Sequence, residues 1–252
     1  MICCIIQART GSARLPKKVI QKIDNDLTVL DYVIDQVKYS QKIEKIIVAT
    51  TNLIEDDLIC KYANLQKIEC FRGSSEDVLD RFYQCAKKYS AKTIVRITAD
   101  NPLIDPNIID KIINEYNKCD FITNTLERTF PYGTEVEVFS FVSLEKAWQI
   151  AKKPSDREHV TFYLWMQPER FKLFRYDYPI NLSKFRFNLD YIQDYCLIRS
   201  VFEALYPQNN LFTLEDTIDW LKQNPKILKF NDMIKPNQGW NKSFSEDEKW
   251  TK

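Results

Sequence analysis

The 252-residue sequence predicts an α/β fold with a mainly parallel β-sheet and helices on both faces. Short apolar runs at residues 2–6, 46–51 and 93–98 have the length of buried strands and are too short for amphipathic helices. Segments with apolar residues at helical spacing separate these runs, and such alternation is typical of parallel sheets. Because ligands of these sheets bind outside the carboxyl ends of the strands, we expect the functional residues in the loops that follow the runs.

The other elements of the first half carry local signals. A capping box from Thr28 to Asp31 precedes one apolar helical face, and Pro106 fits the first turn of another helix. We expect two more helices, one at residues 54–63 and one that opens at Asp77. The remaining expected elements are strands at residues 68–71 and 121–124 and a turn at residues 72–75.

The second half shows a different pattern. Residues 131–139 alternate between apolar and polar side chains, which predicts a half-buried strand with Glu135 and Glu137 on one face. A second capping box, from Ser155 to Glu158, predicts a helix that continues to residue 166. We also expect strands at 171–178 and 185–189, helices at 193–205 and 213–223, and a poorly ordered polar tail at 235–252. No repeat or linker divides the chain, so we expect one domain.

Composition excludes several classes of protein. Lys and Arg number 36 against 35 Asp and Glu, so no net field marks a nucleic-acid or membrane-surface binder. No apolar run approaches the ~20 residues of a membrane span, and the N-terminus lacks a signal-peptide pattern. The seven cysteines form no C-x-x-C pair and there is one histidine, which favours free thiols over disulfides or a zinc site. We expect a cytoplasmic protein with no nucleic-acid or membrane partner.

The loop after the first apolar run concentrates groups that bind phosphate. It contains Ser12 and Gly11, and the use of one of only four glycines here suggests a backbone position that requires it. The four cations of the loop are Arg9, Arg14, Lys17 and Lys18. Backbone N–H groups, a hydroxyl and clustered Arg and Lys side chains at a strand end can hold phosphate. The alternative interpretation is a solvated basic turn.

Seven motifs, taken in order, give the chain a resemblance to a known family. They are Gln-Ala-Arg-x-Gly-Ser-x-Arg-Leu-Pro-x-Lys at 7–18, Val-Ala-Thr-Thr at 48–51, Gly-Ser-Ser-Glu-Asp-Val-Leu-Asp-Arg at 73–81, Arg-Ile-Thr-Ala-Asp-Asn-Pro at 96–102, Pro-Tyr-Gly-Thr-Glu-Val-Glu-Val at 131–138, Asp-Arg-Glu-His-Val at 156–160 and Phe-Asn-Leu-Asp-x-x-x-Asp at 187–194. The set resembles the cytidylyltransferases of the CMP-Kdo and CMP-sialic acid synthetase superfamily, and within it the spore coat polysaccharide biosynthesis protein F group.

This resemblance covers about residues 1–205 and implies a Rossmann-like fold of the nucleotide-diphospho-sugar transferase type. It implies a single nucleotidyltransferase domain, with a nucleotide-binding half at 1–125 and a β-containing acceptor and dimerisation half at 126–234. It places the triphosphate clamp on Arg9, Arg14 and Lys18, which with Asp100 form the expected catalytic set. The expected nucleotide-binding residues are Gln7, Ala8, Arg9, Gly11, Ser12, Arg14, Lys18, Thr50, Thr51, Ser74, Ser75, Arg81 and Asp100.

Some of these residues have simpler interpretations. Thr50, Thr51, Ser74 and Ser75 suit contacts to a base or ribose, but small polar residues at strand ends are also ordinary caps. Arg81 lies one helical turn beyond Asp77, so an intrahelical ion pair competes with a nucleotide contact.

Two aspartates are candidate ligands for Mg²⁺, which proteins hold through carboxylates and substrate phosphates. Asp100 and Asp190 each follow an expected strand, and both match the metal aspartates of the resembling family. The alternative is that Asp100 caps the turn after it and Asp190 caps the helix expected near residue 193.

The acceptor-binding residues are expected in the second half. The candidates are Tyr132, Glu135, Glu137, Arg157 and His159. Glu137 could accept a proton or hold a sugar hydroxyl, and Arg157 could hold a carboxylate or phosphate. His159 has the pKa range of a general base, although a structural hydrogen bond explains a histidine beside Arg and Glu in a helix equally well.

We interpret the chain as a Mg²⁺-dependent cytidylyltransferase that joins CMP from CTP to an acidic sugar for surface glycan synthesis, and as a homodimer. Transfer to a phosphorylated sugar or alcohol, which would give a CDP product, is the nearest alternative. A glycosyltransferase is disfavoured because the Asp-x-Asp motif typical of that class is replaced by Ala99-Asp100-Asn101-Pro102. A nucleotide-binding protein without activity is the third possibility.

Overall fold

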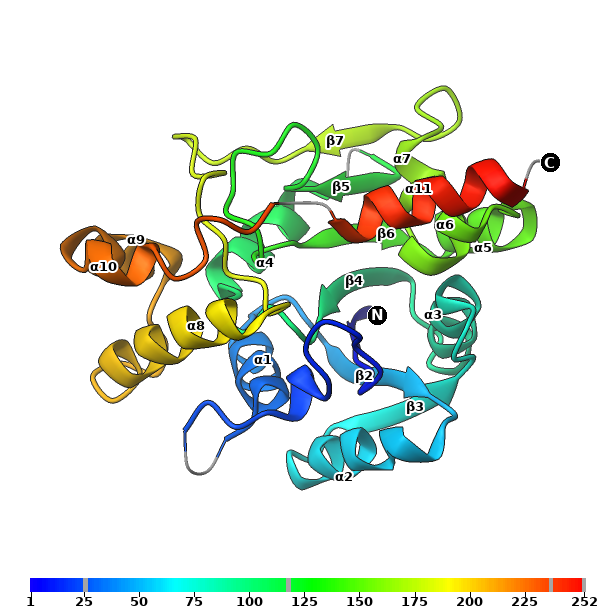
Figure 1. Ribbon diagram of the computed structural model, residues 1–252. Coiled ribbons are helices and arrows are strands. Elements are labelled where there is room, and N and C mark those ends of the chain that lie inside the picture. Colours follow the sequence, from blue (N-terminus) through cyan, green and yellow to red (C-terminus); the bar gives the residue numbers. More distant parts are fainter. Residues whose placement is uncertain (25–26, 117–118, 236–237, 251–252) are drawn as a thin grey trace.

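A seven-stranded sheet forms the centre of the molecule in the computed structural model, which describes residues 1–24, 27–116, 119–235 and 238–250. The strand order is β3-β2-β1-β4-β6-β5-β7 (Figure 1). The strands are β1 (Ile2–Gln7), β2 (Lys45–Thr51), β3 (Glu69–Gly73), β4 (Thr93–Thr98), β5 (Phe121–Thr123), β6 (Glu137–Ser140) and β7 (Leu173–Arg175). Only β6 runs antiparallel to its neighbours, β4 and β5. The predicted mainly parallel sheet is confirmed.

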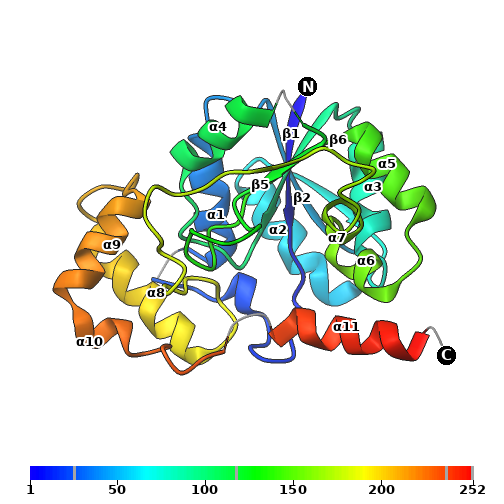
Figure 2. The same cartoon turned by 90° about the horizontal axis from the view of Figure 1, so that it is seen from above.

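Helices cover both faces of this sheet (Figure 2). They are α1 (Val29–Lys38), α2 (Asp57–Leu65), α3 (Val78–Lys88), α4 (Pro106–Glu115), α5 (Phe141–Ile150), α6 (Pro154–His159), α7 (Phe162–Trp165), α8 (Ile192–Leu205), α9 (Leu214–Gln223), α10 (Pro225–Leu228) and α11 (Gln238–Trp250). Two 3₁₀ turns, at Lys18–Ile20 and Ile54–Asp56, precede α1 and α2. Alternate residues of β1 divide between two cores, since Cys4 and Ile6 pack with α1 and α4 whereas Cys3 and Ile5 pack with α3 and α5.

Local capping signals locate several helices correctly. The capping box predicted at Thr28 is present before α1, and Thr213 forms another before α9, inside the segment where we expected a helix. Asp77 caps α3 by accepting from the backbone N–H of Asp80 at 2.8 Å. Pro106 occupies the first turn of α4, as predicted.

The expected strand at 131–139 is wrong for most of its length, because only residues from Glu137 onward join the sheet. Gly133, with a φ of 91°, turns the chain before β6. The expected strand at 185–189 forms a single bridge, between Tyr132 and Arg186. β6 is an interior strand of the sheet, and its residues Val138 and Phe139 are fully buried. Residues 72 and 73, which we expected in a turn, end β3 instead.

The predicted capping box at Ser155 is also wrong. The helix begins one residue earlier, at Pro154, and the backbone N–H of Ser155 donates at 3.0 Å to Asp247 of α11, with its hydroxyl donating to the same carboxylate. The helix ends at His159, because Val160 adopts a φ of 60° before α7 starts. α5 had no counterpart among our expected elements.

Two further expectations change. The polar tail forms α11, which packs along α6 (Figure 1). Cys60 and Cys70 form a disulfide rather than remaining free, because α2 packs on β3 with the two Cα atoms 5.3 Å apart. Within the part of the chain that the structure describes, no helix is both long enough and apolar enough to cross a bilayer.

Candidate active site

The loop after β1 is held in a compact shape by its own backbone. The carbonyl of Thr10 accepts from the N–H groups of Ser12 at 2.9 Å and Lys17 at 3.0 Å, and Lys17 has a left-handed φ of 57°. The expectation that the backbone at position 11 requires glycine is wrong in this conformation. Its φ is not in the left-handed range, and a Cβ added there would meet nothing within 4 Å.

Asp56 fastens this loop to the end of β2. Its Oδ1 accepts from the backbone N–H of Thr10 at 2.8 Å and from the Thr10 hydroxyl at 2.6 Å, while its Oδ2 accepts from the Thr51 hydroxyl. Burial alone would raise the pKa of Asp56, but the threonine hydroxyls and the Thr10 N–H lower it, so the carboxylate is charged. Thr51 therefore anchors the loop, and Thr50 beside it is fully buried.

Lys18 brings the two predicted metal aspartates together. Its Nζ donates to Oδ2 of Asp100 and, at 2.8 Å, to Oδ1 of Asp190. Nη2 of Arg14 donates to the same Asp190 oxygen at 2.6 Å. The backbone N–H of Leu189 donates to the Asp100 carbonyl at 2.9 Å and so ties the two segments. Two of the predicted cations, Arg14 and Lys18, thus meet the two predicted carboxylates at the carboxyl ends of β1 and β4, whereas Arg9 pairs with Glu158.

The charges of neighbouring side chains keep Lys18 and Asp190 ionised. Burial alone would raise the pKa of Asp190, but the charges of Lys18 and Arg14 hold that pKa well below its usual range. Burial would lower the pKa of Lys18, and the charges of Asp100 and Asp190 raise it instead. The lysine is a cation and Asp190 an anion throughout the physiological pH range.

A second group of side chains binds the other carboxylate oxygen of Asp190. Its Oδ2 accepts from Arg186 at 3.1 Å and from Nδ2 of Asn188 at 2.9 Å. Asp194, which is fully buried, accepts from Nε of Arg186 at 2.9 Å and from the backbone N–H of Tyr191 at 3.0 Å. Asp194 therefore completes the start of α8, and Asp190 is free of the capping role that we considered for it.

Beside Asp100 lies a group formed by two of the predicted acceptor residues. Glu135 accepts from the side chains of Asn101 and Arg128, each at 2.7 Å. The Arg128 guanidinium lies 4.1 Å from the centre of the Tyr132 ring. Because Asn101 directly follows Asp100, Tyr132 and Glu135 lie next to the charged centre.

Glu137 belongs to a polar layer on the other face of the sheet. It accepts from Nη1 of Arg96 on β4 and, at 2.9 Å, from the Thr161 hydroxyl. Arg96 also donates to Oε1 of Gln7, the last residue of β1, at 2.9 Å. This layer therefore joins the predicted nucleotide loop to α6 and α7.

Three consecutive residues of α6 contact four other parts of the fold. Arg157 donates from Nε to Asp77 at 2.9 Å and from Nη1 to the carbonyl of Trp148 at 2.9 Å, so it joins α6 to α3 and α5. Glu158 accepts from Nη2 of Arg9 at 2.8 Å. His159 bonds to Ser243 of α11 at 2.8 Å. The structure does not gather the five predicted acceptor residues into one group.

The turn before α3 places the last nucleotide candidates. The hydroxyl of Ser74 accepts from the backbone N–H of Asp77 at 3.0 Å, and its carbonyl accepts from Nη1 of Arg81 at 2.6 Å. The intrahelical pair of Arg81 with Asp77 is wrong, because Asp77 pairs with Arg157. Ser75 is half-buried in the same bend, and Ala8 is buried under the loop.

Sequence reasoning missed several residues that organise this site, among them Asp56, Arg96, Glu158 and Arg186. Asp56 precedes a helix, where an acidic residue is ordinary. Arg96 and Glu158 lie inside two of the seven motifs, and these motifs are the one signal that could have identified them.

The sequence and the fold are both similar to those of known proteins. The family described as cytidylyltransferase matches residues 3–229. An uncharacterized protein of Methanocaldococcus jannaschii is 40% identical over 238 residues, which cover 92% of this chain and 94% of that protein. The spore coat polysaccharide biosynthesis protein SpsF of Bacillus subtilis is 28% identical over 235 residues, 89% of this chain and 95% of that protein.

A more distant relative and a solved structure extend the comparison. The 3-deoxy-manno-octulosonate cytidylyltransferase of Solibacter usitatus is 29% identical over 135 residues, 52% of each chain. A cytidylyltransferase structure from Leptospira borgpetersenii has a TM-score of 0.86 at 35% identity and covers 90% of this chain and 96% of that chain.

Proposed function

Since this chain belongs to the cytidylyltransferase family, we propose that it transfers CMP from CTP to an acidic sugar and releases pyrophosphate. The observation that carries this proposal is the meeting of Arg14 and Lys18 with Asp100 and Asp190 beside the loop after β1. Cations for a triphosphate and carboxylates for a divalent ion are what nucleotidyl transfer requires at one place.

The donor set fits Mg²⁺. One oxygen of Asp100 and one of Asp190 face the same nitrogen, Nζ of Lys18, so both carboxylates already point at a single cationic centre. No group of three or more candidate metal ligands occurs among the described residues, which suits an ion that takes its remaining ligands from phosphates and water. Mg²⁺ held by Asp100 and Asp190 would neutralise phosphate charge.

The chain's own residues then act on the nucleotide and the acceptor. Arg9, Arg14 and Lys18 would bind the β- and γ-phosphates and stabilise the charge that develops on the leaving group. An acceptor hydroxyl oxygen forms a bond to the α-phosphorus while the bond from the α-phosphorus to the bridging oxygen breaks. Pyrophosphate leaves and the hydroxyl proton passes to solvent or to a nearby base. Tyr132 and Glu135, next to Asp100, are placed to orient the acceptor.

The acidic sugar is the acceptor class that the relatives favour. The relative from Solibacter usitatus is named for the sugar acid 3-deoxy-manno-octulosonate, and SpsF is named for polysaccharide biosynthesis. A phosphorylated acceptor is the competing class, and it would give a CDP-linked product with two phosphorus atoms instead of one.

The test is pyrophosphate release from each of the four nucleoside triphosphates with panels of acidic and phosphorylated sugars. We expect release with CTP and an acidic sugar, dependence on Mg²⁺, and a product with one phosphorus atom. Lys18→Met and Asp100→Asn should each lower kcat by about 100-fold or more, because each removes charge that stabilises the transferring phosphates. Lys222→Met, which removes an exposed lysine paired with Asp219 on α9, is the matched control. Release with another triphosphate, or full activity of Lys18→Met, would overturn the proposal.

The homodimer stays a prediction. Light scattering of the eluted protein would give a mass twice that of the 29.9 kDa chain if it is correct.

A further inference from the structure

Arg81 on α3 is a buried cation with unused donors. Its exposed fraction is 0%. Nη1 donates to the Ser74 carbonyl, whereas Nε and Nη2 have no hydrogen-bond partner among the residues that the structure describes. An unsatisfied buried donor is costly, and more so on a charged group. The two free donors therefore indicate an acceptor that reaches Arg81 in another state of the enzyme.

Glu158 is the carboxylate placed to be that acceptor. Arg157, its neighbour on α6, is bonded to Asp77, which lies one helical turn before Arg81 on α3. This bond, and the packing of α6 against α3, bring Glu158 to the helix that carries Arg81. Burial and then the charge of Arg9 lower the pKa of Arg81 to about 10, and the charge of Glu158 opposes them, so Glu158 already acts on Arg81 through its charge.

In this structure Glu158 has a different partner. It accepts from Arg9 at 2.8 Å, and both side chains are partly exposed, at 40% for Arg9 and 32% for Glu158. Such partly exposed pairs contribute little to the stability of a protein. Arg9 belongs to the loop that we assign to the triphosphate, and a polyphosphate carries more charge than one carboxylate. A bound nucleotide would therefore draw Arg9 away from Glu158.

We propose that Glu158 exchanges partners when CTP binds: Arg9 turns to the triphosphate, and the carboxylate passes to Nε and Nη2 of Arg81. An arginine fork holds a carboxylate through two parallel bonds, and Nε with Nη2 is one such pair. Glu158 and Arg81 are then positioning residues, and this role rests on the proposed function. Because Glu158 lies on α6 and Arg81 on α3, the new pair adds a bond between these two helices. Thr161, which follows α6 and donates to the predicted acceptor residue Glu137, would therefore reach its final position only after CTP has bound.

The first test compares CTP binding by calorimetry in the wild type, in Glu158→Gln and in Glu203→Gln, a control that breaks an exposed helical pair with Arg199. Glu158→Gln frees Arg9 in advance, so the Kd for CTP should fall about two- to fivefold. The KM for the acceptor should rise on the order of tenfold, because Arg81 loses the carboxylate that positions α6. Glu203→Gln should change neither constant. Weaker CTP binding in Glu158→Gln, or an unchanged acceptor KM, would overturn the exchange.

Two further measurements keep the test decisive. Arg81→Lys retains the charge but not the fork, so the Kd for CTP should stay unchanged while the acceptor KM rises. A higher Kd for CTP would mean that Arg81 contacts the nucleotide itself.

Arg157 donates to the carbonyl of Trp148, so CTP should change the tryptophan fluorescence of the wild type and not of Glu158→Gln. If Arg81→Lys fails to fold, Glu158→Gln decides alone. A wild type that does not bind CTP would overturn the proposed function, whereas normal CTP binding with identical constants in Glu158→Gln would overturn only the exchange.

Discussion

At the scale of single residues, the site is a balance of buried charges. Lys18 and Asp190 are each only 8% exposed, and each is compensated by more than one partner. Removing one member of such a group leaves the others without compensation, which costs more free energy than the pair itself contributes. The same charges that would bind nucleotide therefore also affect the stability of the fold.

Asp190→Asn tests this balance through its dependence on pH. We expect the free energy of unfolding at pH 7 to fall by about 3 kcal/mol, because three cations lose their shared carboxylate. Folding lowers the pKa of Asp190, so its contribution is complete above the ordinary aspartate value of ~3.9 and is lost as the pH falls toward the folded-state value. Urea unfolding at pH 7 and pH 3.5 should show the difference between variant and wild type narrowing at the lower pH. A difference that does not change with pH would contradict this account.

Two glycines provide a second test at this scale. Gly133 has a φ of 91°, and an added Cβ would lie 2.1 Å from the backbone N of Asn188, in the segment that carries Asp190. Gly133→Ala should destabilise the protein by about 3 kcal/mol or more, because backbone strain and overlap add. Gly11→Ala meets nothing within 4 Å and should leave thermal stability unchanged. Equal melting temperatures of the two variants would sink this prediction.

At the scale of elements, the sequence predicts those helices and strands that are determined by residues close together in the chain. Buried parallel strands and capped amphipathic helices in the first half appear at the predicted places because their signals lie within a few residues. The alternating segment at 131–139 follows the same pattern as a strand, yet Glu135 bonds to Asn101 and Arg128 rather than entering the sheet. Those partners are set by tertiary structure and leave no mark in local periodicity. The ordered motifs predicted the charged centre, while its supports at Asp56 and Arg186 needed the fold.

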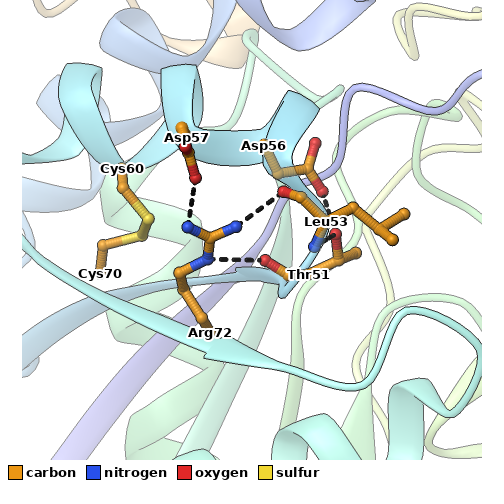
Figure 3. The surroundings of a disulfide bond; sticks show 7 residues. All are labelled: Thr51, Leu53, Asp56, Asp57, Cys60, Cys70 and Arg72. Atoms are coloured by element: carbon orange, nitrogen blue, oxygen red, sulfur yellow. Dashed lines mark hydrogen bonds and ion pairs between the residues drawn. A yellow bond between two sulfur atoms is a disulfide. The ribbon is translucent and has the colours of Figure 1, made fainter.

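The disulfide between α2 and β3 is a tertiary feature of this kind, since ten residues separate Cys60 from Cys70. Figure 3 shows it beside Arg72, which donates at 2.7 Å to the carbonyl of Leu53 and at 3.1 Å to that of Thr51. The disulfide thus strengthens the segment from which Asp56 holds the nucleotide loop. Closing a loop of this length stabilises a protein by about 3 kcal/mol in the chain-entropy account.

Reduction of this disulfide should therefore lower the free energy of unfolding by about 3 kcal/mol. Urea unfolding with and without dithiothreitol measures the loss, and alkylation followed by mass analysis confirms the state of the two thiols. Cys70→Ser should remove the response to dithiothreitol, whereas Cys196→Ser, at an exposed free cysteine, should keep it. A wild type whose stability ignores dithiothreitol would contradict the prediction.

At the scale of the whole molecule, α11 joins the end of the chain to the site. It lies beyond residues 3–229, where the family match ends, and it packs on α6 (Figure 1). Asp247 of α11 accepts from Ser155, and the rings of Phe162 and Phe244 stack with centres 5.4 Å apart. α6, which carries the partner of Arg9, is therefore held from one side by α3 and from the other by α11.

His159 makes this docking sensitive to acid. The ring bonds to Ser243 and stacks on Phe162 at 4.3 Å, and burial, followed by the charges of Arg96 and Arg9, lowers its pKa to about 4. Between the ordinary histidine pKa of ~6.5 and the lower pKa of His159 in the folded chain, the unfolded chain binds a proton at this residue and the folded chain does not. The free energy of unfolding therefore falls as the pH falls. Lowering the pH from 7 to 5 should cost about 2 kcal/mol through this residue. His159 is the only histidine in the sequence, so urea unfolding of the wild type and His159→Gln at the two pH values isolates its contribution. The variant should lose less stability than the wild type on acidification, and an equal loss would show that another group is responsible.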